Sequence, residues 1–461
     1  MRGVSDQDAY LARVERLAAE IRSLPADQPV RLRKKTSNLF RTRQPSKATG
    51  LDVTDLDGVI SIDDEALTAD VQGMTTYEHL LDATLAHGLA PLVVPQLKTI
   101  TLGGAVTGLG IESTSFRSGL PHESVLEMDV LTATGEVVTA RPEGEHSALF
   151  YGFPNSYGSL GYATRLRIEL ERVHPYVRLR HLRFRSAEEL FAAMTEVCAS
   201  QEHEGTPVHF VDGTAFSGQE LYLTLGTWAD ELEPGEEPSD YTGMGVYYRS
   251  VQQRDRDVLT ARDYYWRWDT DWFWCSRAFG AQNPRIRAFW PKRWLRSDAY
   301  WKLIALENRF KVVERIDRRR GKPEQERVIQ DVEVPIEHAA EFHAWFEREI
   351  GIAPVWACPL RQRDASRTYD LYAFDQDTTY VNFGFWSTVD LAPGETDGTH
   401  NRRIEERVAE LSGRKSLYST AFYAEDEFWA IYGGDAYARL KKEYDPAGRL
   451  PDLYAKAVRR A

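Results

Sequence analysis

The sequence predicts an α+β protein of two domains, the second of which is built on an antiparallel sheet. The chain has 461 residues, of which 42% are hydrophobic. At roughly 150 residues per domain, this length allows two or three domains with sizeable cores. Short alternating strand patterns come first, and longer strand patterns interleaved with a few helices follow, which favours mixed α+β domains over an all-helical fold.

Four segments follow from these patterns. Residues 1–29 carry apolar side chains at helical spacing among charges, which predicts an amphipathic helix rather than a signal peptide. Residues 30–175 and 176–413 are the two predicted domains. Residues 414–461 are too short to fold alone, so we expect their two or three short helices to pack back on the first domain.

Local turn and capping signals place the elements of the first domain. Alternating side chains around short turns predict two hairpins, the second turning at Gly135. Capping-box spacing at 75–78 and a stop at Gly88 mark the two ends of a helix. The predicted elements are a hairpin of 58–63 with 67–73, a helix that starts at the 75–78 capping box and stops at Gly88, a hairpin over 126–140 and a strand over 164–170.

The second domain shows strand patterns of seven to ten residues and three amphipathic helical patterns. Together they favour an antiparallel sheet with helices packed on it. The predicted strands are 176–184, 207–216, 220–228, 327–335, 353–360, 368–375 and 380–386, and the predicted helices are 187–199, 336–349 and 400–411.

Composition excludes several classes of protein. The net charge of −13 argues against a general nucleic-acid binder, whose phosphate contacts need a basic surface. The three cysteines lie far apart and the histidines lack metal-ligand spacing, so we expect neither a disulfide scaffold nor a metal site. Since no run of about 18 apolar residues occurs, we expect no membrane span and a cytoplasmic protein.

A glycine-rich stretch over 91–120 carries the chemistry. Its five glycines indicate either sharp turns or a backbone that a cofactor approaches closely. The segment GLGIES lacks the third glycine of a Rossmann fingerprint, and no Walker pattern occurs. The basic loop 30–43 has two interpretations: an anion-binding nest around Ser37 or a solvated basic strand. With a further glycine loop at 153–164, three such loops in one domain favour a dinucleotide.

The order of these motifs resembles the FAD-binding domain of the vanillyl-alcohol-oxidase (PCMH) type of oxidoreductase. Within that superfamily the chain is most similar to the Δ24-sterol reductase family and to its bacterial relatives that reduce methylene fatty acyl chains. The similarity continues through 327–339, 353–360 and 422–446. The resemblance implies a two-domain PCMH/VAO-type fold, with a cofactor domain and a substrate domain.

The resemblance also implies which residues bind FAD. The segment TLGGAVT matches the family's FAD-binding segment, and GSLG matches the segment that closes over the cofactor. The pyrophosphate loop has no His or Cys for a covalent bond, so we expect non-covalent FAD. It also lacks that loop's usual glycines. The implied cofactor-binding residues are Lys35, Thr36, Ser37, Asn38, Thr101, Leu102, Gly103, Gly104, Ala105, Val106, Thr107, Gly110, Ser113, Gly158, Leu160 and Gly161.

The activity that the resemblance implies is reduction of an isolated lipid double bond, most specifically conversion of a 10-methylene to a 10-methyl group on phospholipid acyl chains. NADPH is the expected electron donor and a SAM-dependent methyltransferase an expected partner. Such an alkene needs a proton donor, for which Glu112, Tyr418 and Tyr423 are candidates. Each also has a structural interpretation, Glu112 as a hydrogen-bond acceptor and the tyrosines as core.

Three other functions stay open at this point. They are a Δ24-sterol reductase-like activity, a flavin oxidase or dehydrogenase of a hydroxy acid or sugar, and a non-catalytic lipid-binding scaffold of a methyltransferase complex.

Residues 249–320 combine 18 basic and 9 acidic residues with seven of the twelve tryptophans. Tryptophan interleaved with arginine is typical of a lipid interface, which predicts transient docking on an anionic membrane surface. The alternative is an aromatic core whose arginines pair with acids such as Asp269 and Asp271.

Overall fold

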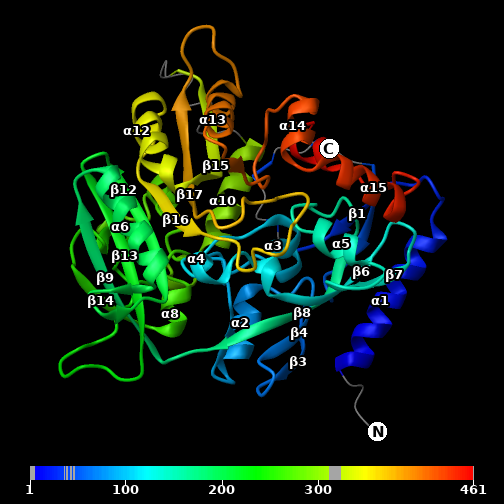
Figure 1. Ribbon diagram of the computed structural model, residues 1–461, viewed down its shortest axis with the longest axis horizontal. Helices are drawn as coiled ribbons and strands as arrows, with labels where there is room; N and C mark the ends of the chain where they lie inside the picture. Colours follow the sequence, from blue (N-terminus) through cyan, green and yellow to red (C-terminus); the bar gives the residue numbers. More distant parts are fainter. Residues whose placement is uncertain are drawn as a thin grey trace.

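The computed structural model describes residues 6–35, 37, 40–41, 44, 47–310 and 323–459. Two sheets lie side by side, each with its own helices (Figure 1). The predicted α+β, two-domain FAD-binding fold is confirmed. In the described part of the chain, no helix has both the length and the apolar character needed to cross a membrane.

The first domain is built on a six-stranded sheet of order β3-β4-β8-β6-β7, with β5 paired to β8, beside a parallel pair β1-β2. Its strands are β1 (Val30–Arg33), β2 (Thr49–Asp52), β3 (Val59–Asp63), β4 (Thr68–Gln72), β5 (Leu89–Pro91), β6 (Val125–Leu131), β7 (Val137–Ala140) and β8 (Tyr162–Arg172). Its helices are α1 (Asp6–Ser23), α2 (Tyr77–Leu85), α3 (Leu102–Gly108), α4 (Ser115–Ser118), η1 (Pro121–Ser124) and α5 (Ser147–Gly152).

Both hairpins predicted in this domain form, as β3-β4 and β6-β7. Gly135 turns the second hairpin at φ +80°, a conformation that glycine adopts without strain. Helix α2 begins one residue later than the capping-box spacing suggests. Thr76 caps it by accepting from the His79 amide (3.3 Å), while the Thr75 hydroxyl bonds Gly58 instead.

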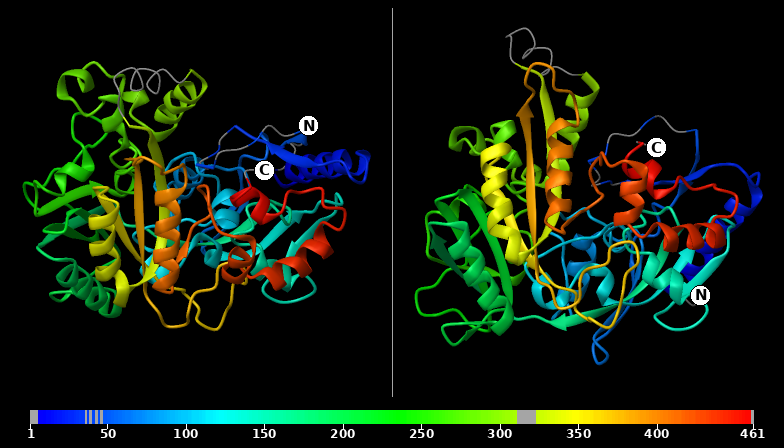
Figure 2. Two further views of the ribbon diagram at one scale, coloured as in Figure 1. Left: turned by 90° about the horizontal axis from the view of Figure 1, so that it is seen from above. Right: turned by 45° about the horizontal axis from the view of Figure 1, so that its top comes forward.

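The second domain is an eight-stranded sheet of order β14-β9-β13-β12-β16-β17-β15-β18, antiparallel at every pairing. Helices α6, α12 and α13 cover one face of it (Figures 1 and 2). The strands are β9 (Tyr176–Phe184), β12 (Phe210–Ser217), β13 (Glu220–Ala229), β14 (Arg256–Thr260), β15 (Gln325–Pro335), β16 (Val355–Leu360), β17 (Tyr380–Asp390) and β18 (Arg414–Lys415), beside a small β10 (Glu202–His203) and β11 (Thr206–Pro207) pair. The covering helices are α6 (Ala187–Ser200), η4 with α12 (Ile336–His338, Ala339–Glu349) and α13 (Thr399–Glu410).

Alternation along the strands divides this sheet into a helix-covered face and a face toward the first domain. Val332 and Val334 of β15 pack under the helices. Asp331 and Glu333 therefore point to the opposite face, since successive strand side chains alternate. Trp356 of β16, on that opposite face, shares a core with side chains of the first domain.

The predicted strand over 368–375 is wrong, because these residues lie in the loop that joins β16 to β17. Its alternating apolar side chains enter the first domain's core, including Leu371 and Tyr372. Asn155 donates to the Leu371 carbonyl (2.8 Å), so a side chain supplies what a neighbouring strand would otherwise supply.

Apart from strand β14, residues 241–310 form a connection of mostly short helices between β13 and β15. The C-terminal helices return to the first domain, where α15 lies beside α5 (Figure 1). The connection contains α7 (Tyr247–Ser250), α8 (Ala261–Tyr265), η2 (Cys275–Phe279), α9 (Pro284–Arg287), η3 (Lys292–Trp294) and α10 (Ser297–Phe310). The C-terminal helices are α14 (Glu425–Ile431), α15 (Gly434–Tyr444) and α16 (Leu453–Ala457).

Candidate functional site

Helix α3 contains the TLGGAVT segment and begins against the end of β4. Thr101 caps the helix by accepting from the Gly104 amide (3.2 Å), and the Gly103 amide donates to the Gly73 carbonyl (2.9 Å). A Cβ on Gly103 would lie 2.6 Å from that carbonyl oxygen, so glycine is required there for backbone packing. The first amides of α3 are thus occupied within the protein.

Open backbone donors lie in two neighbouring loops. The amides of Gly110, Ile111, Gly158 and Leu160 donate no hydrogen bond to another described residue. Tyr157 joins the loops, since its amide donates to the Thr107 carbonyl (2.9 Å) and its hydroxyl to the Gly108 carbonyl. Because unpaired buried amides are costly, these donors fit a bound group rich in acceptors, such as FAD.

The remaining cofactor residues predicted in these segments are buried or half-buried and have structural roles. Leu102, Ala105 and Val106 are in the hydrophobic core, and a Cβ on Gly161 would lie 2.7 Å from Val130. The Thr107 hydroxyl bonds the Gly103 carbonyl (2.7 Å). Ser113 lies in a separate polar network described below. The structure therefore assigns most of this segment to positioning the loops that carry the open amides.

Of residues 35–41, the structure describes Lys35, Ser37, Phe40 and Arg41. Lys35 is exposed, and Thr36 and Asn38 lie outside the described residues. The Ser37 carbonyl accepts from Trp301 Nε1, and the Phe40 amide donates to the Tyr418 carbonyl (2.9 Å).

Arg41, which the sequence patterns did not single out, places a positive charge in this region. Its guanidinium lies 4.5 Å from the centre of the Tyr157 ring. Arg41 is 8% exposed, so its charge acts in a poorly solvated setting next to the two loops with open amides.

Tyr418 meets an acid from β15 beside this loop. Trp386 Nε1 donates to the Tyr418 hydroxyl oxygen (2.9 Å), and the hydroxyl bonds the Asp331 carboxylate. Burial raises the pKa of Asp331 to about 7, although bonds from Tyr418 and from Asn382 (3.2 Å) oppose the rise. The nearby Glu333 is buried, which raises its pKa to about 8, so a half-buried and a buried carboxyl with pKa values near neutrality face the first domain.

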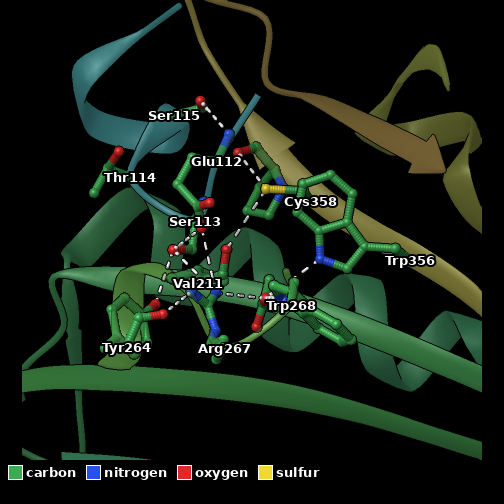
Figure 3. A network of polar contacts seen from close by, with 12 residues as sticks. Glu112, Ser113, Thr114, Ser115, Val211, Tyr264, Arg267, Trp268, Trp356 and Cys358 are labelled. Carbon is green, nitrogen blue, oxygen red and sulfur yellow. Dashed lines mark hydrogen bonds and ion pairs between the residues drawn. The ribbon is translucent and has the colours of Figure 1, made fainter. Parts of the chain in front are cut away.

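Glu112 belongs to a different cluster (Figure 3). Its Oε1 accepts from the Ser113 amide (2.7 Å) and from Arg267 Nη2 (3.2 Å), and Arg267 also contacts Asp212 (3.0 Å). Burial raises the pKa of Glu112, and the Arg267 charge opposes the rise. Trp268 and Trp356 also donate to Asp212 (both 3.3 Å), so the cluster ties the glycine segment to the second sheet.

Tyr423 lies in a third place, among the C-terminal helices. Its ring packs against Tyr432 and Phe428, with ring centres 6.0 and 6.4 Å away. Of the three candidate proton donors, only Tyr418 contacts the described residues of 35–41, through Phe40. One signal could have found Asp331: Asp331 and Glu333 are two acids at i, i+2, and therefore lie on one face of the predicted strand.

Two glycine loops with open amides, a buried cation and a half-buried acid–tyrosine pair form an arrangement that fits a flavin-dependent oxidoreductase. A family model for an FAD binding domain matches residues 7–141. The chain is an FAD-dependent oxidoreductase.

Three relatives are similar to this chain over most of its length. The Δ24-sterol reductase of Arabidopsis thaliana is 25% identical over 438 residues, covering 88% of this chain and 76% of the relative. The Δ24-sterol reductase of Homo sapiens is 25% identical over 417 residues, covering 87% and 76%. Cytokinin dehydrogenase 5 of Oryza sativa subsp. japonica is 27% identical over 401 residues, covering 83% and 71%.

Proposed function

We propose that this protein reduces an isolated carbon–carbon double bond of a lipid, with non-covalent FAD and with NADPH as electron donor. The observation that carries the proposal is the likeness to Δ24-sterol reductases over 87–88% of the chain. The resemblance to bacterial methylene-acyl reductases supports a narrower substrate, the 10-methylene group of a phospholipid acyl chain. A methyltransferase that builds such a group is then the reaction that supplies the substrate.

An isolated alkene is not electrophilic, so its reduction needs a proton at one carbon as hydride reaches the other. Bound FAD, once reduced, supplies the hydride. The proton adds to the CH₂ carbon and the hydride to the substituted carbon, so the C=C π bond is replaced by two C–H bonds.

Asp331 and Tyr418 can supply that proton together. When Asp331 is protonated, its carboxyl donates to the Tyr418 oxygen, which also accepts from Trp386 (2.9 Å). With its oxygen accepting twice, the Tyr418 hydroxyl is free to give its own hydrogen to the alkene while Asp331 replaces it. A carboxyl with a pKa of about 7 is protonated in part of the molecules at neutral pH and is a far stronger acid than tyrosine.

Aromatic side chains around Tyr418 support this chemistry by excluding water and by tolerating positive charge on the substrate. The Phe40 ring centre lies 5.7 Å from that of Tyr418 and 5.6 Å from that of Trp272. Trp386 packs against Phe273 with ring centres 4.4 Å apart.

The test is incubation of the purified, flavin-loaded protein with methylene-bearing phospholipid and NADPH, followed by fatty-acid analysis. A methyl-branched product is the expected result. No product from this lipid, with flavin present and reducible, refutes the methylene substrate, and turnover of a Δ24-sterol instead identifies the sterol alternative. A protein without flavin absorbance would support the scaffold alternative.

The likeness to cytokinin dehydrogenase 5 favours a second candidate, oxidation rather than reduction of substrate. That activity predicts flavin reduction by a substrate in the absence of NADPH. Anaerobic mixing with hydroxy acids, sugars and lipid, each without NADPH, separates the two: bleaching of the flavin by one of these substrates supports the dehydrogenase.

A further inference from the structure

Four large apolar side chains are exposed in residues 244–294, within the connection that runs from β13 to β15. Phe289 is 90% exposed, Met244 55%, Trp294 53% and Ile286 44%. Most other tryptophans of the connection are buried, Trp266, Trp268, Trp272 and Trp274 among them. We call Met244, Ile286, Phe289 and Trp294 the Phe289 face. Exposed apolar patches of this kind mark interaction sites, because isolated soluble surfaces rarely gather large apolar side chains.

A buried arginine holds the Phe289 face in shape. Arg287 of α9 pairs with Asp271 (2.7 Å) and donates to the carbonyls of Gly243 (2.7 Å) and Gly245 (2.8 Å), on either side of Met244. Its guanidinium therefore joins the loop that carries Met244 to the helix that carries Ile286. The apolar side chains project from a scaffold that is fixed by charged hydrogen bonds.

The surroundings of the Phe289 face are basic. Residues 277–303 contain seven basic residues and one acidic residue, although the whole chain carries a net charge of −13. Arg277, Arg285 and Arg293 are exposed, and none of them forms an ion pair with another described residue. Exposed apolar side chains among unpaired cations fit an anionic lipid bilayer, which offers headgroup charge and hydrocarbon at one surface.

Residues 277–303 also contact the candidate site. Trp301 of α10, a few residues after Trp294, donates to the Ser37 carbonyl, and its ring lies 4.9 Å from Phe40. Phe40 in turn contacts Tyr418. Figure 2 shows this segment, in lighter green, along one edge of the molecule. A lipid at the Phe289 face is therefore next to elements that contact the FAD-binding domain.

We propose that the Phe289 face docks the protein on an anionic bilayer, with Phe289 and Trp294 in the headgroup–acyl boundary and the arginines on anionic headgroups. The docking proposal rests on the proposed function, because the proposed substrate is a membrane lipid. The proposed partner is a lipid bilayer, not a second copy of the chain or another protein.

Co-sedimentation of the full-length flavoprotein with vesicles tests the proposal. Vesicles of phosphatidylcholine with phosphatidylglycerol should bind the wild type, and pure phosphatidylcholine vesicles should bind it at least tenfold more weakly. Phe289→Ala/Trp294→Ala and Arg285→Gln/Arg293→Gln should each weaken binding roughly tenfold or more. Leu11→Ala/Leu126→Ala, which removes exposed apolar side chains elsewhere, should bind as the wild type does.

Three outcomes overturn the docking proposal: unchanged binding by both face variants, equal binding to both vesicle types, or a change from dimer to monomer in light scattering on Phe289→Ala/Trp294→Ala. The last outcome would show that a second copy covers the face. The proposed function is tested apart from docking by turnover of detergent-dispersed lipid, which the face variants should leave unchanged. Failure of the wild type in that assay, with vesicle binding lost in the variants, refutes the proposed function alone.

Discussion

Arg267→Met tests whether the cluster of Figure 3 holds the two domains together. The Arg267 side chain is 0% exposed and contacts carboxylates from both domains, Glu112 at 3.2 Å and Asp212 at 3.0 Å. Its guanidinium also lies 3.9 Å from the Tyr264 ring centre. Removing one partner of a buried ion pair costs about 3–5 kcal/mol, because the opposite charges stay buried without compensation. We expect a loss of that size in the free energy of unfolding.

The loss should depend on pH, with a definite sign. Burial raises the pKa of Glu112, and removing the Arg267 charge raises it further. A carboxyl whose folded pKa lies above its unfolded value binds a proton on folding, so its contribution to stability falls as pH rises above the unfolded pKa. The deficit of Arg267→Met relative to the wild type should therefore be larger at pH 8 than at pH 5.5.

Urea unfolding followed by tryptophan fluorescence at both pH values measures this. Arg285→Met is the matched control, since Arg285 is exposed and unpaired among described residues, and it should change stability by less than about 0.5 kcal/mol. Adding Glu112→Gln to Arg267→Met should recover part of the loss. A deficit below about 1 kcal/mol, or one that is equal at both pH values, would refute the argument.

Three further predictions concern the site. Asp331→Asn should lower the reduction rate by about 10²–10⁴. Because the reaction needs a proton on a carboxyl with a pKa of about 7, the wild-type rate should fall above pH 7, and the variant should lose this fall. A wild-type pH–rate profile that is flat through pH 7 contradicts the prediction. Tyr418→Phe should lower the rate similarly while flavin absorbance persists, whereas Tyr423→Phe should leave the rate unchanged. Gly103→Ala should cost about 1–3 kcal/mol of stability in thermal or urea unfolding, because its Cβ would meet the Gly73 carbonyl at 2.6 Å; Gly58→Ala, with nothing nearer than 3.5 Å, is the control.

Local signals and segment order were readable from the sequence. The hairpins β3-β4 and β6-β7 and helix α2 depend on turns and caps within a few residues of each element, so their patterns predict them well. The FAD-binding class was likewise visible, because its motifs are short segments in a set order. The alternating pattern at 368–375 gave a wrong strand prediction, because apolar side chains of this loop pack in the core of the first domain.

Only the tertiary structure decided which side chains meet. Asp331 and Tyr418 are far apart in the chain, and they come together because β15 pairs with β18, with Val332 opposite Lys415. The same holds for the tryptophans of residues 241–310. The sequence does not show which of them are buried, but in the structure Trp268 is 1% exposed and Trp294 is 53% exposed. Residue type sets what a side chain can do, whereas long-range pairing and burial set its neighbours, its pKa and its access to solvent. The sequence therefore determined the class of chemistry, and the packing of two sheets decided where that chemistry and the proposed membrane contact can lie.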